Sequence, residues 1–383
     1  MQITFLGTGS AQPSATRNHQ AMALRMEGDI WLFDCGEATQ HQLQKSTLKM
    51  GRITKIFITH MHGDHCFGLA PLLCSMTENL NSAKPMAEKP PIDVYGPSSL
   101  RRWLRITLKS TRSRLGRTYR VHELLLNDDE EDLTDDDLHP DEVLGENLRL
   151  QNHASHHVIH CQRKEGADAY TVLGVPIKHS IPSWGFIIKE PSRPGKMNVD
   201  ALLPLINRNA EALRSQGCKP MTILGELQRG NAPLTLPDGT VLQPPVPQPG
   251  REVVILGDTN DPSAIIPLCS QPHLLVHEAT NALTSLDRAN LKPGTMPPTF
   301  EQVEERARDH GHSTPQMAAR VAKQIQAKKL VLTHFSARYK GDQSEDGLAI
   351  MEEIRQLAII NLDNRENDVF CARDLWSFEI KYN

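Results

Sequence analysis

The stretch KIFITHMHGDH at residues 55–65 decides the fold. An apolar run leads into a loop that holds three histidines and an aspartate. His60 and His62 are two positions apart, so on extended backbone both imidazoles can point to one side. After a turn, Asp64 and His65 can reach a second point nearby. Imidazole nitrogen and carboxylate oxygen are suitable zinc ligands, so the loop predicts part of a metal site whose other ligands come from elsewhere in the chain.

Other segments repeat the pattern of an apolar, β-rich run that ends in polar residues. They are REVVILGDTND (251–261), HLLVHEAT (273–280) and KKLVLTHFS (329–336). Such runs are typical of strands buried on both faces, and a helical pattern at 313–328 favours an α/β protein. Ligands bind beyond the carboxyl ends of such strands, so we expect one shared site. Asp258 and His334 each follow a strand there, and His179 is a further candidate ligand.

Composition bounds the class of protein. The 383 residues are 39% apolar and carry a net charge of −4, which does not favour an obviously basic nucleic-acid binder. The sequence contains no run of 18 apolar residues, so it predicts no membrane-spanning helix. The N-terminus lacks the pattern of a signal peptide. Seven scattered cysteines without a CxxC motif favour a reducing compartment. We therefore expect a cytoplasmic protein, with the nucleus as a further location, and no membrane partner.

Three segments differ from the rest of the chain in their composition. Residues 101–120 carry eight Lys/Arg and no acid, which fits either a solvated helix face or a surface that contacts phosphates. Residues 123–170 are first acidic and then rich in histidine, as in HASHHVIH (153–160), and are expected to be an irregular insertion. Residues 189–250 are rich in proline and are expected to protrude between two core strands.

The motifs together resemble a known family. HMHGDH, a later histidine, GDT and LTHFS resemble the metallo-β-lactamase superfamily. FLGTGSAQPSATR, LFDCGEATQ, HEAT, HGHSTP and LTHFSARY resemble ribonuclease Z, the tRNA 3′-processing endonuclease, in its short form, over roughly residues 1–340. The resemblance implies an α/β fold, a four-layer αβ/βα sandwich with a protruding arm. It implies one catalytic domain over 1–383, with a flexible tRNA-binding arm at 189–250.

The resemblance also implies two zinc ions per subunit, although this ligand set accepts manganese or iron as well. One zinc would be held by His60, His62 and His179, the other by Asp64, His65 and His334, with Asp258 bridging both. In the arm, the residues expected to touch RNA phosphates are Lys189, Arg193, Lys196 and Arg208. The Gly-Pro motif of the family's arm is not present here.

Four residues receive further roles from the resemblance. Asp64 would orient and deprotonate the attacking water. Asp34 would accept the second N–H of a ligand histidine. His312, supported by Glu278, would give a proton to the departing ribose oxygen. From sequence alone, however, His312 could instead be a contact at a helix N-terminus, and Glu278 could be a buried, hydrogen-bonded carboxylate.

The expected function is removal of 3′ trailers from precursor tRNA, by hydrolysis after the discriminator nucleotide. The products would be a tRNA 3′-hydroxyl and a 5′-phosphorylated trailer, and the enzyme would be a homodimer. Two alternatives stay open. One is another hydrolase of the same fold that acts on a small phosphodiester or a thioester. The other is an RNA-binding relative without catalytic activity.

Overall fold

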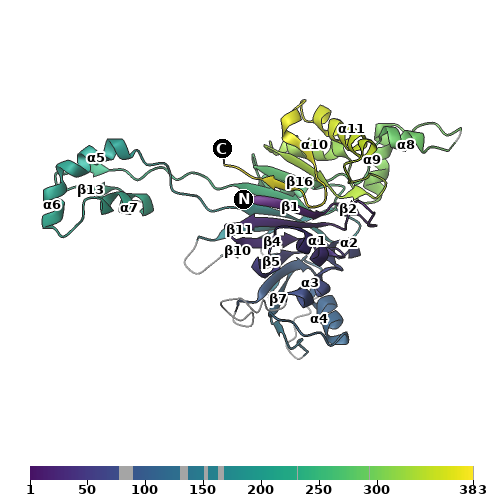
Figure 1. Ribbon diagram of the computed structural model, residues 1–383, viewed down its shortest axis with the longest axis horizontal. Coiled ribbons are helices and arrows are strands. Elements are labelled where there is room, and N and C mark those ends of the chain that lie inside the picture. Colours follow the sequence, from purple (N-terminus) through teal and green to yellow (C-terminus); the bar gives the residue numbers. More distant parts are fainter. Residues whose placement is uncertain are drawn as a thin grey trace. The chain divides into compact units, whose positions relative to one another are not determined.

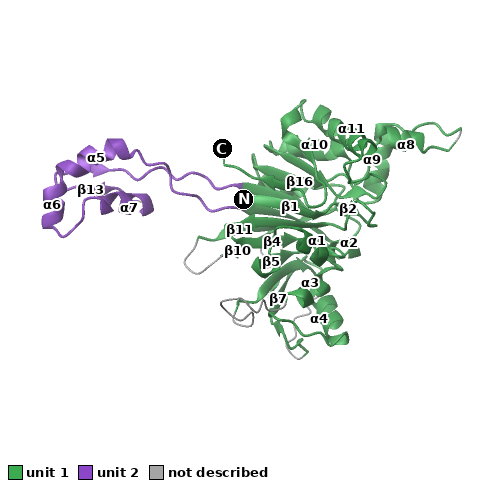
Figure 2. Ribbon diagram, in the orientation of Figure 1, with its two compact units in different colours: residues 1–188, 252–383 green, residues 189–251 purple. Residues whose placement is uncertain are grey.

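The structure is a computed structural model, shown in Figure 1. It describes residues 1–76, 89–129, 137–150, 154–162, 168–230, 232–292 and 294–382. The chain divides into two compact units (Figure 2). Unit 1 comprises residues 1–188 and 252–383, and unit 2 comprises residues 189–251.

Two β-sheets form the middle of unit 1. Among the described residues, the first sheet contains β1 (Gln2–Gly7), β3 (Ala21–Met26), β4 (Asp29–Phe33), β5 (Ile53–Phe57), β6 (Ile92–Pro97), β7 (Tyr119–Leu125), β8 (Glu142–Val143), β9 (Asn147–Arg149) and β20 (Ser377–Glu379). Its order is β20-β1-β3-β4-β5-β6-β7-β8, and β9 also pairs with β7. The strands from β4 to β7 are parallel to one another, so their carboxyl ends lie at one edge.

The second sheet has the order β10-β11-β12-β15-β16-β17-β19. These strands are β10 (His157–Cys161), β11 (Tyr170–Ile177), β12 (Ser183–Lys189), β15 (Glu252–Leu256), β16 (Leu274–Glu278), β17 (Leu330–Thr333) and β19 (Val369–Cys371). The last four are mutually parallel. The short strands β2 (Gly9–Ser10) and β18 (Phe335–Ser336) pair with each other beside the sheets.

The sheets pack face to face through aromatic side chains. Phe33 and Phe57 of the first sheet stack at 4.9 Å between ring centroids, and Phe57 lies 5.2 Å from Phe186 of the second. Trp31 and Trp184 are fully buried in the same core. Because each of these strands has a second apolar face, both sheets need a cover of helices.

Helices cover both outer faces of the sandwich, as Figure 1 shows. The first sheet packs against α1 (Thr39–Lys45), α3 (Leu69–Ser75) and α4 (Leu100–Ser110), with α2 (Gly63–Cys66) at its edge, and the second against α10 (Pro315–Gln324) and α11 (Glu345–Asn361). The predicted four-layer αβ/βα sandwich is therefore confirmed. The remaining helices of unit 1 are α8 (Ser285–Ala289), α9 (Phe300–Asp309) and the 3₁₀ turns η1 (Met50–Arg52), η3 (Ser263–Leu268) and η4 (Glu366–Asp368).

Unit 2 has a small apolar core of its own. It contains α5 (Val199–Arg208), α6 (Ala210–Ser215), α7 (Thr222–Arg229) and the hairpin of β13 (Leu234–Thr235) and β14 (Val241–Leu242). Ile206, Leu213 and Leu227 from the three helices are buried against Leu242 of the hairpin. The unit is thus held by its own side chains.

The segment 123–170 differs from its prediction. Its described residues include β8, β9 and β10, because pairing with neighbouring strands orders backbone that lacks a strong local pattern. The prediction of an irregular insertion is wrong for these strands. Residues 130–136, 151–153 and 163–167 lie outside the described residues, and His153 is one of them. On β10, His157 packs 5.1 Å from Trp184 while His160 faces solvent, so these two histidines do not converge.

The basic run at 101–120 has two kinds of arginine. Arg101 and Arg105 are buried on the inner side of α4, where they pair with Glu123 and Glu142. Arg102, by contrast, is exposed. Part of the basic run therefore serves to hold α4 on the sheet.

Candidate metal centre

The predicted ligands come together where the carboxyl ends of both sheets meet. His60 and His62 follow β5 of the first sheet, while Asp258 and His334 follow β15 and β17 of the second. His179 follows β11. Strands from both sheets end here because the aromatic core packs the two sheets face to face, with their carboxyl-end edges side by side. Chain segments far apart in sequence therefore deliver polar side chains to one point.

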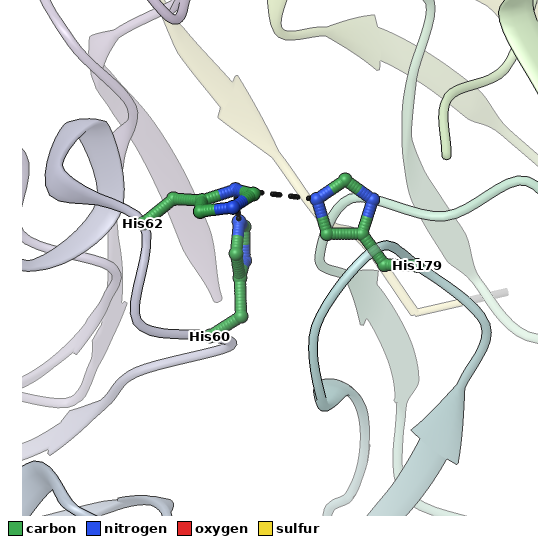
Figure 3. Close-up of side chains that lie close together, drawn as sticks. All are labelled: His60, His62 and His179. Carbon is green, nitrogen blue, oxygen red and sulfur yellow. Dashed lines mark hydrogen bonds between the residues drawn. The ribbon is translucent and has the colours of Figure 1, made fainter. Parts of the chain in front are cut away.

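His60, His62 and His179 form one cluster, shown in Figure 3. The His62 Nδ1 atom lies 3.1 Å from His60 Nε2 and 3.3 Å from His179 Nε2. The other ring nitrogen of His179 donates to the Gly311 carbonyl at 2.7 Å, which leaves Nε2 free to face the cluster. Gly311 has φ +79°, and a Cβ there would lie 2.6 Å from His179 Nδ1. Glycine is therefore required at this position for the carbonyl to approach the ring.

Asp64, His65 and His334 form a second cluster. His65 Nε2 lies 3.0 Å from His334 Nε2, and Asp64 Oδ2 lies 3.4 Å from that same His334 atom. Asp64 Oδ2 also accepts a hydrogen bond from the backbone N–H of Ala11 at 2.7 Å. Three ligand-type atoms thus converge from the short helix α2 and from the residue that follows β17.

Asp258 lies between the two clusters. Its Oδ2 is 3.8 Å from His60 Nε2 and 3.4 Å from His65 Nε2, and its Oδ1 is 3.3 Å from His334 Nδ1. One buried carboxylate therefore reaches histidines of both clusters, which is the position that a bridging ligand needs.

Neighbouring side chains fix the ligand rings. Asp34 Oδ2 accepts a hydrogen bond from His65 Nδ1 at 2.7 Å, and Asp34 is itself held by the backbone N–H and hydroxyl of Thr59. His334 Nδ1 lies 3.0 Å from the hydroxyl of Thr280. Asp34 and His334 have φ values of 58° and 57°, a conformation that costs free energy for a residue with a side chain. The surrounding bonds hold this strain at the centre.

The electrostatics of the centre favour bound cations. Burial lowers the pKa values of His60, His62 and His179, so these rings are neutral and can donate a lone pair. Burial alone would also lower the pKa of His65, but the carboxylates around it raise that pKa well above its usual range. Burial would raise the pKa of Asp258, yet the surrounding imidazoles keep it well below its usual value. Buried, ionised carboxylates among nitrogen donors fit a pair of divalent cations.

A second histidine–carboxylate pair lies at the edge of the centre. His312 Nδ1 is 3.1 Å from Glu278 Oε1 and 3.8 Å from Asp258 Oδ2. Burial disfavours the protonated ring, but the carboxylates of Glu278 and Asp258 raise the pKa of His312 to about 9. Among the described residues, none makes a hydrogen bond with His312 Nε2, and the side chain is 18% exposed. This nitrogen can therefore face a substrate.

Sequence reasoning missed residues that hold the ligands. Thr280 donates to Glu278 Oε2 at 2.6 Å and contacts His334, so one hydroxyl joins the two parts of the centre. The Thr59 hydroxyl contacts His60 Nδ1 at 3.0 Å. Thr280 belongs to HEAT, and that motif was a usable signal. The backbone groups of Ala11 and Gly311 gave no such signal in the sequence.

The four candidate RNA contacts belong to unit 2, whereas all seven candidate metal ligands belong to unit 1. Lys189 and Arg193 are half-buried, and residue 193 forms a β-bridge with residue 248. Lys196 is exposed. Arg208 is exposed and pairs with Asp238 and with the hydroxyl of Thr240. The structure does not bring these four residues together into one cluster comparable to the metal centre.

Comparison with known proteins gives the family. A family model described as "Anti-Pycsar protein Apyc1" matches residues 1–112. The chain is 41% identical over 355 residues to zinc phosphodiesterase ELAC protein 1 of Bos taurus, which covers 89% of this chain and 87% of that protein. It is 35% identical to the ribonuclease Z of Anoxybacillus flavithermus, with 93% of each covered. The chain belongs to the ribonuclease Z family.

Solved structures agree with the ribonuclease Z assignment. A crystal structure of human tRNase Z, short form, matches all of both chains with a TM-score of 0.61 and 32% identity. The metallo-β-lactamase fold protein YhfI from Bacillus subtilis matches with a TM-score of 0.52 at 14% identity, which bears on the fold alone. As a ribonuclease Z family member the chain is an enzyme, a hydrolase of the metallo-β-lactamase fold. Within the described residues, no helix is both long and apolar enough to span a membrane.

Proposed function

We propose that the chain is a zinc-dependent endoribonuclease that removes 3′ trailers from precursor tRNA. Hydrolysis after the discriminator nucleotide would leave a tRNA 3′-hydroxyl and a 5′-phosphorylated trailer. The observation that carries this proposal is the position of Asp258, between two ligand clusters and 3.8 Å from the His312 ring. That arrangement combines a cation site with a proton donor, and hydrolysis of a phosphodiester whose leaving group is a ribose oxygen is accelerated by both.

The proposed cofactors are two zinc ions per subunit, held by the seven ligands predicted above. Bound there, the cations would neutralise the phosphate and lower the pKa of water. The nitrogen and oxygen donors would also accept manganese or iron. In each cluster the ligand-type atoms lie within 4.8 Å of one another, which supports the assignment.

Asp64 is the proposed base. Burial would raise its pKa, but His65 and His334 lower it, so the carboxylate stays ionised and can accept a hydrogen bond from the attacking water. It would take up the proton because bound cations would lower the pKa of that water. The Ala11 N–H bond and His334 fix its orientation. Water held by this carboxylate would attack the phosphorus on the side opposite to the departing oxygen.

His312 is the proposed acid for the departing ribose oxygen. Glu278 accepts the bond from Nδ1, which orients the ring and favours the protonated imidazole, and Nε2 would deliver the proton. Glu278 is held in turn by the Thr259 N–H at 2.8 Å and by the Thr280 hydroxyl. The carboxylate is therefore a fixed support for the acid.

Unit 2 is the proposed tRNA-binding arm. It carries eight Lys/Arg and five Asp/Glu, whereas the whole chain has a net charge of −4. An excess of positive charge favours contact with the phosphate backbone. We also propose a homodimer, as the family resemblance implies, and a cytoplasmic location, with the nucleus as a further location; in both the seven free cysteines would stay reduced.

An end-mapped cleavage assay tests the proposal. Precursor tRNA with a 3′ trailer is incubated with the wild type and with Asp64→Ala, with and without a chelator. One cut after the discriminator, absent in the variant and in chelator, is expected. Failure of zinc-loaded wild type to cut would favour one of the alternatives: hydrolysis of a small phosphodiester or thioester, or RNA binding without catalysis.

A further inference from the structure

A cavity of about 400 Å³ lies behind the HEAT motif and has no part in the metal chemistry described above. Leu283, Leu291 and Val303 give it apolar walls, and Asn281 and Arg306 add polar groups. Its volume is within the range of small-ligand sites, and apolar walls with a few polar groups are typical of them. A flat nucleobase with one sugar is a ligand of suitable size and chemistry.

One side of the cavity is a fixed network around Arg338. The guanidinium donates to Asp287 Oδ1 at 2.8 Å, to Asn281 Oδ1 at 3.1 Å and to the Tyr339 hydroxyl at 2.7 Å. It also lies 4.4 Å from the centroid of the Tyr339 ring. Tyr339 is fully buried and bonds to Asp287 and Ala282. This wall is therefore organised before any ligand arrives.

Three polar groups at the cavity keep unused bonding capacity. Arg306 is exposed and makes no ion pair among the residues that the structure describes. His310 Nδ1 bonds to the Arg306 carbonyl at 2.7 Å, which leaves Nε2 as a free acceptor. The Asn281 amide uses its oxygen for Arg338, so its NH₂ group remains available. Two donors and one acceptor can thus serve the polar edge of a base or its ribose.

The cavity is linked to the surroundings of the proposed acid by one backbone hydrogen bond and by one peptide bond. The carbonyl of Ala307, which lines the cavity, accepts the backbone N–H of His312 at 2.8 Å. Asn281 directly follows Thr280, whose hydroxyl contacts both Glu278 and His334. Consecutive Cα atoms are about 3.8 Å apart, so the cavity wall begins next to the centre.

We propose that this cavity binds the nucleotide whose 3′-oxygen departs, which is the discriminator nucleotide of the tRNA. The inference rests on the proposed function. His312 must lie beside the departing oxygen to protonate it, and the discriminator carries that oxygen. The cavity beside His312 is therefore the place for its base, with Leu283 and Val303 against the ring faces and Arg306 and Asn281 at polar edges.

Removing the discriminator base from the substrate tests the proposal. The kcat/KM for a precursor tRNA with a normal discriminator is compared with that for the same RNA with an abasic discriminator. In wild type we expect the abasic substrate to be cleaved about tenfold less efficiently. In Val303→Trp, which fills the cavity, and in Arg306→Ala, the difference should shrink to about twofold or less, since the base no longer has its site.

Arg308→Ala is the matched control. Arg308 lies on the same helix, but its guanidinium contacts Glu304 and the Asn260 carbonyl rather than the cavity, so this variant should keep the full tenfold difference. A 4-thiouridine discriminator should cross-link to the peptide 281–310 in wild type and not in Val303→Trp. An equal effect of base removal in all variants, or a cross-link elsewhere, would overturn the proposal. If wild type fails to cut either substrate at the discriminator, the proposed function itself fails.

Discussion

The metal centre of unit 1 and the basic surface of unit 2 are built on opposite principles. In the centre the candidate ligands are buried or partly buried, and most have a partner outside the ligand set, as Asp34 is for His65 and Gly311 is for His179. In unit 2 the charged groups are exposed or paired locally, as Arg208 is with Asp238. Chemistry at a phosphate requires atoms fixed in place, whereas contact with a phosphate backbone requires only charge. Substitutions should therefore cost far more in the centre than in the arm.

The largest effect is expected for Asp258→Ala. Removing the carboxylate that reaches both clusters should abolish binding of both metal ions and lower kcat/KM by about 10³-fold or more. Mass spectrometry of bound metal alongside cleavage kinetics measures this. Asp261→Ala is the control, because Asp261 pairs with Lys178 at the surface and should keep the metals. Full zinc content in Asp258→Ala would contradict the bridging role.

His312→Ala should retain both metal ions but slow cleavage of precursor tRNA by about 10²- to 10⁴-fold, because the departing ribose oxygen loses its proton donor. Bis(p-nitrophenyl) phosphate provides the comparison, since its leaving group departs without protonation. Its hydrolysis should slow far less. Equal losses on both substrates would remove His312 as the acid.

Asp34→Asn should weaken metal binding by about 10- to 100-fold, because His65 loses the carboxylate that orients its ring. Competition with a chelator of known affinity measures the change, and excess zinc should restore much of the activity. An unchanged metal affinity would mean that the strained backbone at Asp34 alone positions His65.

The arm should give the smallest effects. Lys196→Glu reverses an exposed charge and should raise KM for precursor tRNA about threefold at low salt, with less effect at high salt. Arg208→Ala should change KM less, because its guanidinium already has Asp238 as a partner. Steady-state kinetics at two salt concentrations measures the change in KM for each of the two variants. A larger loss in Arg208→Ala would mean that RNA displaces Asp238.

The same contrast explains what the sequence could predict. The seven candidate ligands follow strands with strong apolar patterns, and the sandwich brings those strand ends together, so motif and fold point to the same residues. Thr59 and Gly311 act through a hydroxyl and a carbonyl, groups that every sequence offers in abundance. The strands β8, β9 and β10 were missed because they form by pairing with the neighbouring strands β7 and β11, and their own residues have no strong strand pattern. The partner of Arg208 likewise depends on the folding of unit 2 on itself.

Titration of zinc into chelator-treated protein tests the central claim most directly, with end-mapped cleavage of precursor tRNA measured at each addition. If the two clusters and Asp258 form one catalytic centre, cleavage after the discriminator should appear only as the second equivalent of zinc per subunit binds. Full activity at one equivalent, or cleavage without bound metal, would contradict the account.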